Sequence, residues 1–354
     1  MIVKNLYVRH YRNHENASFS FAPGLNTISG PNACGKTNLV EAIYYLSLAR
    51  SFRGVEDTSL IMKGQEYGEI DSDVFEGDIK RHIHILIAEK GRTVYVNGKK
   101  VSKLSELTKC VNVLLFEPKD VMLFKGPPKE RRNYLDISLS KRFPAYLDYI
   151  SHYEKALKER NEILKSDNLD EKLLDSNAEI LVKYSLPIVE YRTKFVKDIN
   201  DILIKITRAL TGVRGKLEIN YKPFIPYTPN YKNDALNAYN RALESDIKHK
   251  ATSIGIHRED FSIALNGRDI ATYGSQGENR LVALALKLSP YFLYEDKDKR
   301  PVIVLDDVMS ELDKTHQDRL ITFLRKFEQV FITGTKLEID GATQIKLHKT
   351  KEVF

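Results

Sequence analysis

The sequence predicts an α/β fold in which both ends of the chain build one head and the middle forms a mainly helical insertion. A strand-like segment, a glycine-rich loop and a helical pattern follow one another over residues 25–48. From about residue 127 to residue 214 the composition changes to long helix-period stretches rich in Leu, Lys, Glu and Tyr. Apolar strand-like segments then return towards the C-terminus. We therefore expect a head over residues 1–122 and 250–354 and a mainly helical arm over residues 123–249.

The expected elements follow in order along the chain. Apolar runs and alternation indicate strands in the first third, at Ile2–Val8, Ala17–Phe21, Asn26–Ser29, His82–Ile87, Thr93–Val96 and Val111–Phe116. Helical spacing indicates helices at Asn38–Leu48, Arg131–Ser140, Phe143–Lys165, Leu173–Ala209 and Leu281–Leu288. Strands return at Leu217–Tyr221, Phe261–Leu265, Val302–Leu305 and Val330–Thr333. This order predicts an α/β nucleotide-binding domain built from both ends of the chain, with a helical arm inserted in the middle.

The composition is that of a globular protein of one large domain or two, since 42% of the 354 residues are hydrophobic and 29% are charged. No apolar run approaches the ~20 residues of a membrane span, and Lys4 interrupts the start where a secretion signal needs apolar residues. The only cysteines, Cys34 and Cys110, favour a reducing cytoplasm over a disulfide framework. The net charge of +7 is compatible with a nucleic-acid partner without requiring one.

Residues 30–37 read G-P-N-A-C-G-K-T, which matches the phosphate-loop pattern G-x-x-x-x-G-K-[ST]. In such a loop the backbone N–H groups face a polyphosphate, Lys36 reaches the β- and γ-phosphates, and the Thr37 hydroxyl binds Mg²⁺. A glycine turn before a helix is the plainer interpretation, and it loses weight because partner motifs follow. The expected ATP-binding residues are Gly30, Pro31, Asn32, Ala33, Cys34, Gly35, Lys36, Thr37 and Asn38.

The apolar strand Val302–Leu305 ends in the two carboxylates Asp306 and Asp307. Acids at the carboxyl end of a buried parallel strand face the crevice in which such sheets bind ligands. We expect Asp306 to hold Mg²⁺ through water and Asp307 to orient the attacking water. A strand followed by a capping aspartate is the plainer alternative. Because transporter-type ATPases usually carry Glu at the second position, the shorter Asp307 predicts slow hydrolysis, with ATP binding as the useful state.

Residues 273–280, Y-G-S-Q-G-E-N-R, precede a helix about 30 residues before the acidic strand. Ser275, Gly277 and the free N–H groups of a helix start form a second anion-binding device. Taken alone, this segment is a loop and a helix cap. In a chain with a phosphate loop, its position matches the plan of ABC and SMC ATPases, in which this loop completes the site of the opposite subunit. We therefore expect an ATP-dependent homodimer, with Ser275 of one subunit on the phosphate bound at Lys36 of the other.

At this point the chain resembles the RecF family along nearly its whole length. The segments that carry the resemblance are, in order, Tyr11–His14, Gly30–Asn38, Ser51–Arg53, Phe116–Asp120, Lys125–Pro127 with Arg131–Arg132 and Leu135–Asp136, Gly255–Asp260, Gly274–Glu278 and Leu305–Asp313. The departures are modest: Cys34 stands where Gln is common, Ile256 replaces Pro, Glu259 replaces Asp and Glu278 replaces Gln. The resemblance implies an ABC/SMC-like ATPase head.

The resemblance also implies activity and partners. An ATP-bound dimer would grip duplex DNA or the single-/double-strand junction at a gap, without reading sequence. With RecO and RecR it would help load RecA onto single strands coated by SSB. ATP hydrolysis, weak and stimulated by DNA, would release it. Arg12 and Asn13 become neighbours of adenosine only by this resemblance.

Two further expectations concern particular side chains. Cys34 lies at a helix N-terminus, so we expect it to alkylate readily unless ATP shields it. The DNA-binding candidates form a basic cluster whose plainer interpretation is a solvated helix face: Lys125, Lys129, Arg131 and Arg132, with Lys141 and Arg142. The region after the last strand, Thr333–Thr335, lacks the family's histidine, and no role is assigned to it.

Other functions fit the sequence less well. Residues 335–338, T-K-L-E, resemble the guanine-reading [NT]-K-x-D of GTPases, but Glu338 has a different reach and no D-x-x-G occurs at the switch position. A kinase would need a lid and an acceptor site. Two alternatives stay open: an ABC-type ATPase of another pathway, and a nucleotide-gated DNA clamp or scaffold in which hydrolysis is incidental.

Overall fold

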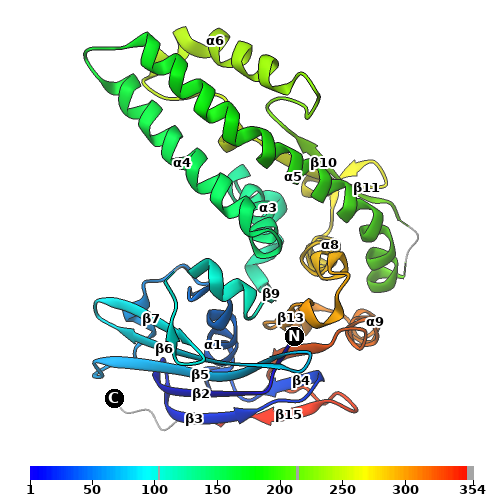
Figure 1. The fold of residues 1–354 in the computed structure, drawn as a ribbon. Helices are drawn as coiled ribbons and strands as arrows, with labels where there is room; N and C mark the ends of the chain where they lie inside the picture. The colour runs from blue at the N-terminus through cyan, green and yellow to red at the C-terminus, as the bar shows by residue number, and fades with distance from the viewer. Residues whose placement is uncertain (103, 213–214, 349–354) are drawn as a thin grey trace. The chain divides into compact units, whose positions relative to one another are not determined.

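The computed structural model describes residues 1–102, 104–212 and 215–348 (Figure 1). The chain divides into two compact units. The first comprises Met1–Val121, Lys205–Arg214 and Ser275–Phe354, and the second comprises Met122–Ile204 and Gly215–Gly274. The sequence boundary at residue 250 therefore differs from the structural one at residue 275. Residues 260–265 belong to the second unit because they form a strand that pairs along its length with a strand at 217–222.

The first unit contains a five-stranded parallel sheet with the order β15-β4-β14-β13-β9. Its strands are β4 (Gly24–Ser29), β9 (Val113–Phe116), β13 (Val302–Leu305), β14 (Gln329–Gly334) and β15 (Thr343–Lys346). All four neighbouring pairs are parallel, so their carboxyl ends share one edge. Every residue of β13 and β14 is buried, as expected for central strands of a covered parallel sheet.

A seven-stranded antiparallel sheet has the path β3-β2-β5-β6-β7-β8, with β1 paired to β5. The strands are β1 (Ile2–Val3), β2 (Asn5–Tyr11), β3 (His14–Ser20), β5 (Tyr67–Glu76), β6 (Ile79–Ala88), β7 (Gly91–Val96) and β8 (Lys99–Lys100). Helix α1 (Lys36–Leu48) is buried from Leu39 to Ser47, and it shares one apolar cluster with strands of both sheets. This packing fixes the start of α1 against the sheet edge.

Two more helices of the first unit follow segments that the sequence assigns to the nucleotide site. Helix α8 (Gln276–Leu288) follows the loop at residues 274–275, and α9 (Lys314–Leu324) follows the acidic segment after β13. Short 3-10 turns lie at Asp57–Leu60, Leu104–Lys109, Pro118–Val121, Ser289–Leu293, Lys297–Lys299 and Met309–Glu311.

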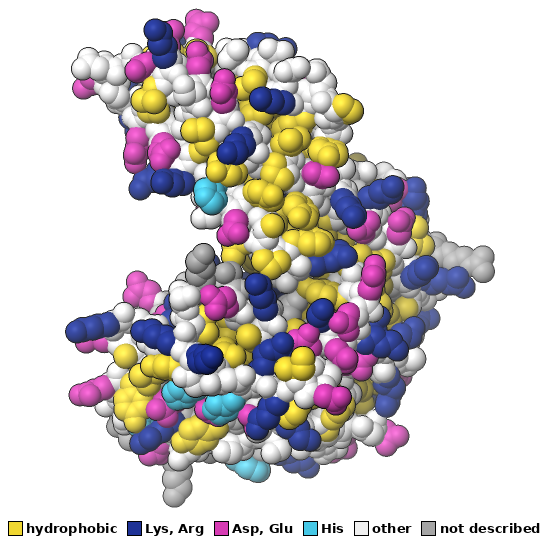
Figure 2. All heavy atoms as spheres, in the orientation of Figure 1, with side chains coloured by type: hydrophobic (Ala, Val, Ile, Leu, Met, Phe, Trp, Pro, Cys, Tyr) yellow, Lys and Arg dark blue, Asp and Glu magenta, His cyan; other side chains and the backbone are white. Residues whose placement is uncertain are grey.

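The second unit is mainly helical (Figure 1), and on the face drawn in Figure 2 hydrophobic side chains gather along its helices. Its helices are α2 (Met122–Lys125), α3 (Pro128–Arg142), α4 (Pro144–Lys165), most of α5 (Glu171–Thr211), α6 (Tyr231–His249), a 3-10 turn at Ile256–Arg258 and α7 (Ile270–Tyr273). A small antiparallel sheet joins β10 (Leu217–Lys222), β11 (Asp260–Leu265) and β12 (Arg268–Asp269). Among the described residues, no helix combines the length and apolar character that crossing a bilayer requires.

A buried polar network holds the second unit together. The guanidinium of Arg192 on α5 donates to the carboxylates of Asp136 and Glu259 and to the hydroxyl of Tyr146. The side chain of Arg192 is only 2% exposed. Because a buried charge is tolerated only when it is paired and hydrogen-bonded, these contacts fix α3 and α4 against α5 and the segment before β11.

Candidate nucleotide-binding site

The phosphate loop joins β4 to α1 at the carboxyl edge of the parallel sheet, and its two glycines are required by close contacts. Gly35 has φ +99°, and a Cβ there would lie 2.6 Å from Asn13 Oδ1. A Cβ on Gly30 would lie 2.4 Å from the carbonyl oxygen of Leu347. The loop is therefore clamped between the turn before β3 and the chain that follows β15.

Lys36 and Thr37, the two functional side chains of the loop, have different hydrogen-bond partners. Lys36 Nζ donates to the carbonyl oxygens of Gly30 and Pro31, both at 2.8 Å. Thr37 Oγ1 donates to Asp306 Oδ1 at 3.2 Å. The expected Mg²⁺ ligands, 269 residues apart in the sequence, are thus neighbours in the structure.

The Asp306 carboxylate is held by a residue that sequence reasoning missed. Thr333, at the end of β14, donates its hydroxyl to Asp306 Oδ1 at 2.7 Å and accepts the Asp307 N–H at 2.9 Å. Burial raises the pKa of Asp306. Among the described residues both of its side-chain hydrogen bonds reach Oδ1, which leaves Oδ2 with lone pairs for a metal ion or its water. Thr333 is visible in the sequence only as a strand residue, since its reach to β13 depends on strand order.

Asp307 differs from Asp306 in exposure and in backbone conformation. Its side chain is exposed, and its φ of +47° lies in the left-handed region that non-glycine residues rarely adopt. Its carbonyl oxygen accepts hydrogen bonds from Arg280 Nη2 at 2.8 Å and from Ser310 Oγ at 3.2 Å. The carboxylate is therefore free to meet water while its backbone is fixed.

Ser275 is the N-cap of α8 and forms a reciprocal capping box with Glu278. Its Oγ accepts the Glu278 N–H at 3.2 Å, and its own N–H donates to Glu278 Oε2 at 2.9 Å. The hydrogen bond from the Ser275 N–H, with a contribution from the Ser275 side chain, lowers the pKa of Glu278 and keeps its carboxylate ionised. Residues 275–278 are all exposed, and the space around Gly277 is open. Within the described part of the chain, no hydrogen bond or ion pair joins Ser275 or Gly277 to the phosphate loop.

Arg12 and Asn13 lie beside the start of α1. Arg12 donates through Nε and Nη2 to the carboxylate of the buried Glu41, both at 2.9 Å, and through Nη1 to the carbonyl oxygen of Ser59. The Oδ1 of Asn13 accepts a hydrogen bond from Asn38 Nδ2 at 2.8 Å. Asn13 thus borders the loop, whereas the guanidinium of Arg12 is engaged with Glu41 and Ser59.

Glu117 and Asp120 were part of a family segment in the sequence, without an assigned role. They follow β9, whose last residue Phe116 pairs with Leu305 of β13, so Glu117 lies one strand away from Asp306. Burial raises the pKa of Glu117 to about 6. Asp120 pairs with Lys287 on α8 at 2.7 Å. The order of the parallel strands, which the sequence does not give, is what brings these acids to the site edge.

Two sequence expectations meet contrary structural facts. Cys34 is buried, with 2% exposure, which argues against the ready alkylation expected of it. Arg131 forms an ion pair with Asp260, and Arg132 donates to the carbonyl oxygen of Glu259. All three guanidinium nitrogens of Arg131 donate to acceptors of the second unit, whereas Arg132 has one such hydrogen bond, from Nη1, in the described part of the chain.

The other DNA-binding candidates also differ in how far their side chains are exposed. Lys141 is buried, and the Arg142 guanidinium lies 4.9 Å from the centre of the Phe143 ring. Among Lys125, Lys129, Arg131 and Arg132, the two lysines are exposed and the two arginines are half-buried.

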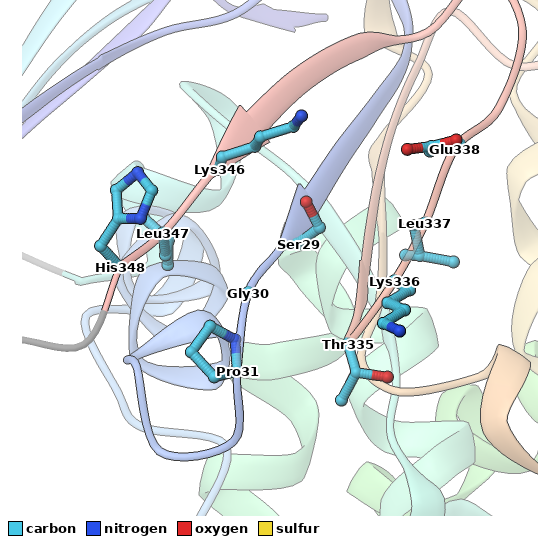
Figure 3. Close-up of a pocket in the computed structure, with 10 residues that line it drawn as sticks. All are labelled: Ser29, Gly30, Pro31, Thr335, Lys336, Leu337, Glu338, Lys346, Leu347 and His348. Atoms are coloured by element: carbon cyan, nitrogen blue, oxygen red, sulfur yellow. The ribbon is translucent and has the colours of Figure 1, made fainter.

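A cavity of about 670 Å³ opens beside the first residues of the phosphate loop. Figure 3 shows it at the ends of β4, β14 and β15, with its lining residues Ser29, Gly30, Pro31, Thr335, Lys336, Leu337, Glu338, Lys346, Leu347 and His348. It lies beyond the carboxyl ends of parallel strands, where open α/β sheets bind ligands. It includes the T-K-L-E segment singled out in the sequence.

Comparison with known proteins places this geometry in a family. The model of the RecF/RecN/SMC N-terminal domain matches residues 2–344. A protein of Streptococcus agalactiae serotype Ia described as "DNA replication and repair protein RecF" is 38% identical over 342 residues, covering 96% of this chain and 92% of the relative. A protein of the same description from Lachnoclostridium phytofermentans is 33% identical over 343 residues, covering 96% and 94%. The chain belongs to the RecF family.

Solved structures agree with this assignment. The recombination mediator protein RecF with ATP, described as part of the RecFOR pathway, has a TM-score of 0.89 and 33% identity, covering 98% of this chain and 95% of that one. An Smc head domain from Pyrococcus furiosus has a TM-score of 0.57 at 18% identity, covering 94% and 89%, and supports the fold alone. The expected fold class, an ABC/SMC-like phosphate-loop ATPase head with an inserted mainly helical part, is confirmed.

Proposed function

We propose that this RecF-family protein is an ATP-dependent recombination mediator that dimerises on ATP and grips DNA at gaps. The observation that carries the proposal is the Thr37–Asp306 hydrogen bond, because it joins the two halves of a nucleotide–metal site in a chain of this family. A RecF relative of the same fold is described with ATP in the RecFOR pathway, which supports ATP as the nucleotide.

The residues present suit ATP with Mg²⁺. Within the described residues, no group of three His, Cys, Asp or Glu side chains could hold a metal by itself. Mg²⁺ in nucleotide sites commonly uses one or two protein ligands together with phosphate oxygens and water. Thr37 and Asp306 would hold the ion, which would neutralise charge on the β- and γ-phosphates. Lys36 would turn from the loop carbonyls to the phosphates.

Hydrolysis in this proposal is slow and serves release. The Asp307 carboxylate is exposed and would orient the attacking water. It is one methylene shorter than the glutamate usual in transporter-type ATPases, and small misplacements of a catalytic group cost large factors in rate. We expect a turnover number below the ~1–10³ s⁻¹ that is typical of enzymes, raised by DNA.

The exposed start of helix α8 supports the proposed dimer. Residues 275–278 face solvent, and no hydrogen bond or ion pair joins them to the phosphate loop of the same chain among the described residues. A second copy can therefore present the phosphates held at its Lys36 to Ser275 and Gly277 of the first. The helix N-terminus favours such an anion.

The DNA and partner proteins follow from the family. We propose sequence-independent binding to duplex DNA and to single-/double-strand junctions, and action with RecO and RecR to load RecA onto SSB-coated strands. Lys125 and Lys129 remain the candidate phosphate contacts, because their side chains are exposed.

Sedimentation velocity tests the proposal. The protein is compared with and without ATP–Mg²⁺ and gapped duplex DNA, beside Lys36→Arg and Ser275→Arg, with Ser245→Arg as an exposed serine control on α6. We expect an ATP-dependent dimer that carries DNA in the wild type and in Ser245→Arg, and monomers in the other two variants. A dimer that tolerates Ser275→Arg, or a monomer indifferent to ATP, would refute the shared site.

The alternative of a scaffold without essential hydrolysis is separated by Asp307→Asn, which keeps the shape of the side chain and removes its charge. An enzyme that needs turnover would stay locked on DNA in this variant. A scaffold would release DNA and support RecA loading at the wild-type rate.

A further inference from the structure

Arg280 links the start of α8 to the acidic segment after β13, two parts of the site that are separate in the sequence. It lies on α8, five residues after Ser275, and it is 2% exposed. Its Nη2 donates to the carbonyl oxygen of Asp307 at 2.8 Å, and its Nη1 pairs with the carboxylate of Glu311. One buried guanidinium thus connects the helix that begins at Ser275 with the segment that follows β13.

The contact acts on a strained peptide. The φ of +47° at Asp307 lies in the left-handed region that is unfavourable for residues other than glycine. The N–H of Asp307 is held by Thr333 and its carbonyl oxygen by Arg280, with a longer hydrogen bond from Ser310 Oγ. Because hydrogen bonds fix both sides of the residue, the direction of the Asp307 side chain depends on Thr333 and Arg280.

We propose that Arg280 is a positioning residue that relays the placement of the Ser275 helix to the Asp307 carboxylate. Five residues of helix span about 7.5 Å and move as one body. When the partner's phosphate binds at Ser275, a shift or a loss of mobility of the α8 start reaches the Asp307 carbonyl through the planar fork of the guanidinium. The rate of ATP hydrolysis thereby depends on whether the second subunit is bound. This inference rests on the proposed function.

A merely structural role for Arg280 makes a different prediction. If the side chain served only to fill and hold the fold, its loss would weaken nucleotide binding, dimer formation and thermal stability together. A positioning role affects the chemical step while ATP binding persists, because no hydrogen bond or ion pair joins Arg280 to Lys36 or Thr37 among the described residues.

The test compares Arg280→Ala and Arg280→Lys with Glu311→Ala. The last variant removes the partner of Nη1 and keeps the Nη2 contact to Asp307. ATP dissociation constants, ATP-dependent dimerisation, kcat and melting temperature are measured for each. We expect kcat to fall about 10- to 100-fold in Arg280→Ala, with the ATP dissociation constant within about threefold of wild type. Glu311→Ala should stay within about twofold in kcat.

Arg280→Lys keeps the proposal testable if Arg280→Ala does not fold. A lysine retains the charge but lacks the planar fork that joins two acceptors. The kcat of Arg280→Lys should therefore lie between those of the wild type and Arg280→Ala. If Arg280→Ala does not fold, we expect the kcat of Arg280→Lys to be at least threefold below wild type. An unchanged kcat, or equal losses in kcat and ATP affinity, would overturn the relay.

Asp307→Asn, assayed in parallel, separates the two levels of the argument. If it leaves hydrolysis unchanged, the proposed role of Asp307 fails, and the relay fails with it. If it abolishes hydrolysis while both Arg280 variants keep the wild-type kcat, only the relay fails.

Discussion

The imidazole of His257 is a half-buried neutral base in the helical unit. Its Nδ1 lies 3.0 Å from the Tyr153 hydroxyl, and its Nε2 lies 3.2 Å from the carbonyl oxygen of Thr252. Burial lowers the pKa of His257 to about 4; the carbonyl of Thr252 opposes the shift, and the charges of Arg258 and Arg132 add to it. The contacts suit a ring that donates through Nε2 and accepts from the tyrosine.

This lowered pKa predicts a stability loss in acid. In the unfolded chain the ring takes up a proton near pH 6.5, whereas the folded protein resists protonation down to about pH 4. The stabilising contribution is therefore complete above pH 6.5 and is lost as the pH falls towards 4, by roughly 3 kcal/mol in total. Denaturant unfolding of the wild type and His257→Asn at pH 7.5, 6 and 5 measures it. We expect a smaller decline in the variant; equal declines would contradict the assignment.

At the scale of elements, the ion pair of Arg131 and Asp260 joins α3 to β11. Arg131 Nη1 also donates to the carbonyl oxygen of Gly126 at 2.8 Å, so one side chain holds the end of α2 as well. Arg131→Ala leaves a partly buried carboxylate without its partner and should lower the free energy of unfolding by about 2 kcal/mol. Lys129→Ala, on the same helix but exposed, should change it by less than about 0.5 kcal/mol.

For DNA affinity we expect the reverse: Lys129→Ala should have the larger effect and Arg131→Ala the smaller one. If Lys129 contacts a phosphate, its loss should reduce the salt slope of DNA affinity by about 0.9. Arg131→Ala should leave that slope unchanged in the fraction that remains folded. Denaturant titrations and binding isotherms at several salt concentrations measure both quantities. A reduced slope in Arg131→Ala with unchanged stability would restore this arginine to the DNA surface.

The same contact explains what the sequence could and could not predict. Local patterns sufficed for the phosphate loop, for β13 and for α8, because each is specified by neighbouring residues. Arg131 looked like part of a basic surface because its partner, Asp260, is 129 residues away. Strand β15 and the role of Thr333 were missed for a related reason: both depend on which strands are neighbours in the sheet, and the side-chain pattern of a strand does not encode that order.

At the scale of the whole molecule, the nucleotide-site residues and the helical unit belong to separate cores. The phosphate loop, Asp306, Thr333 and Ser275 all lie in the first unit, whereas the second has its own buried network around Arg192. Helix α5 belongs to both units, since its residues from Lys205 onward lie in the first. A ligand that binds only the first unit should therefore stabilise the two units unequally.

Hydrogen exchange with ATP and Mg²⁺ tests this. At a nucleotide concentration of 100 times the dissociation constant, binding stabilises the unit that holds it by about 2.7 kcal/mol. We expect slower exchange in residues 24–48 and 302–334, and in residues 275–288 where a second copy engages Ser275. Residues 215–265 should exchange as they do without nucleotide. Lys36→Arg should abolish the protection, while Ser275→Arg should abolish it only in residues 275–288. Equal protection of residues 215–265 would show instead that the two units unfold as one cooperative body.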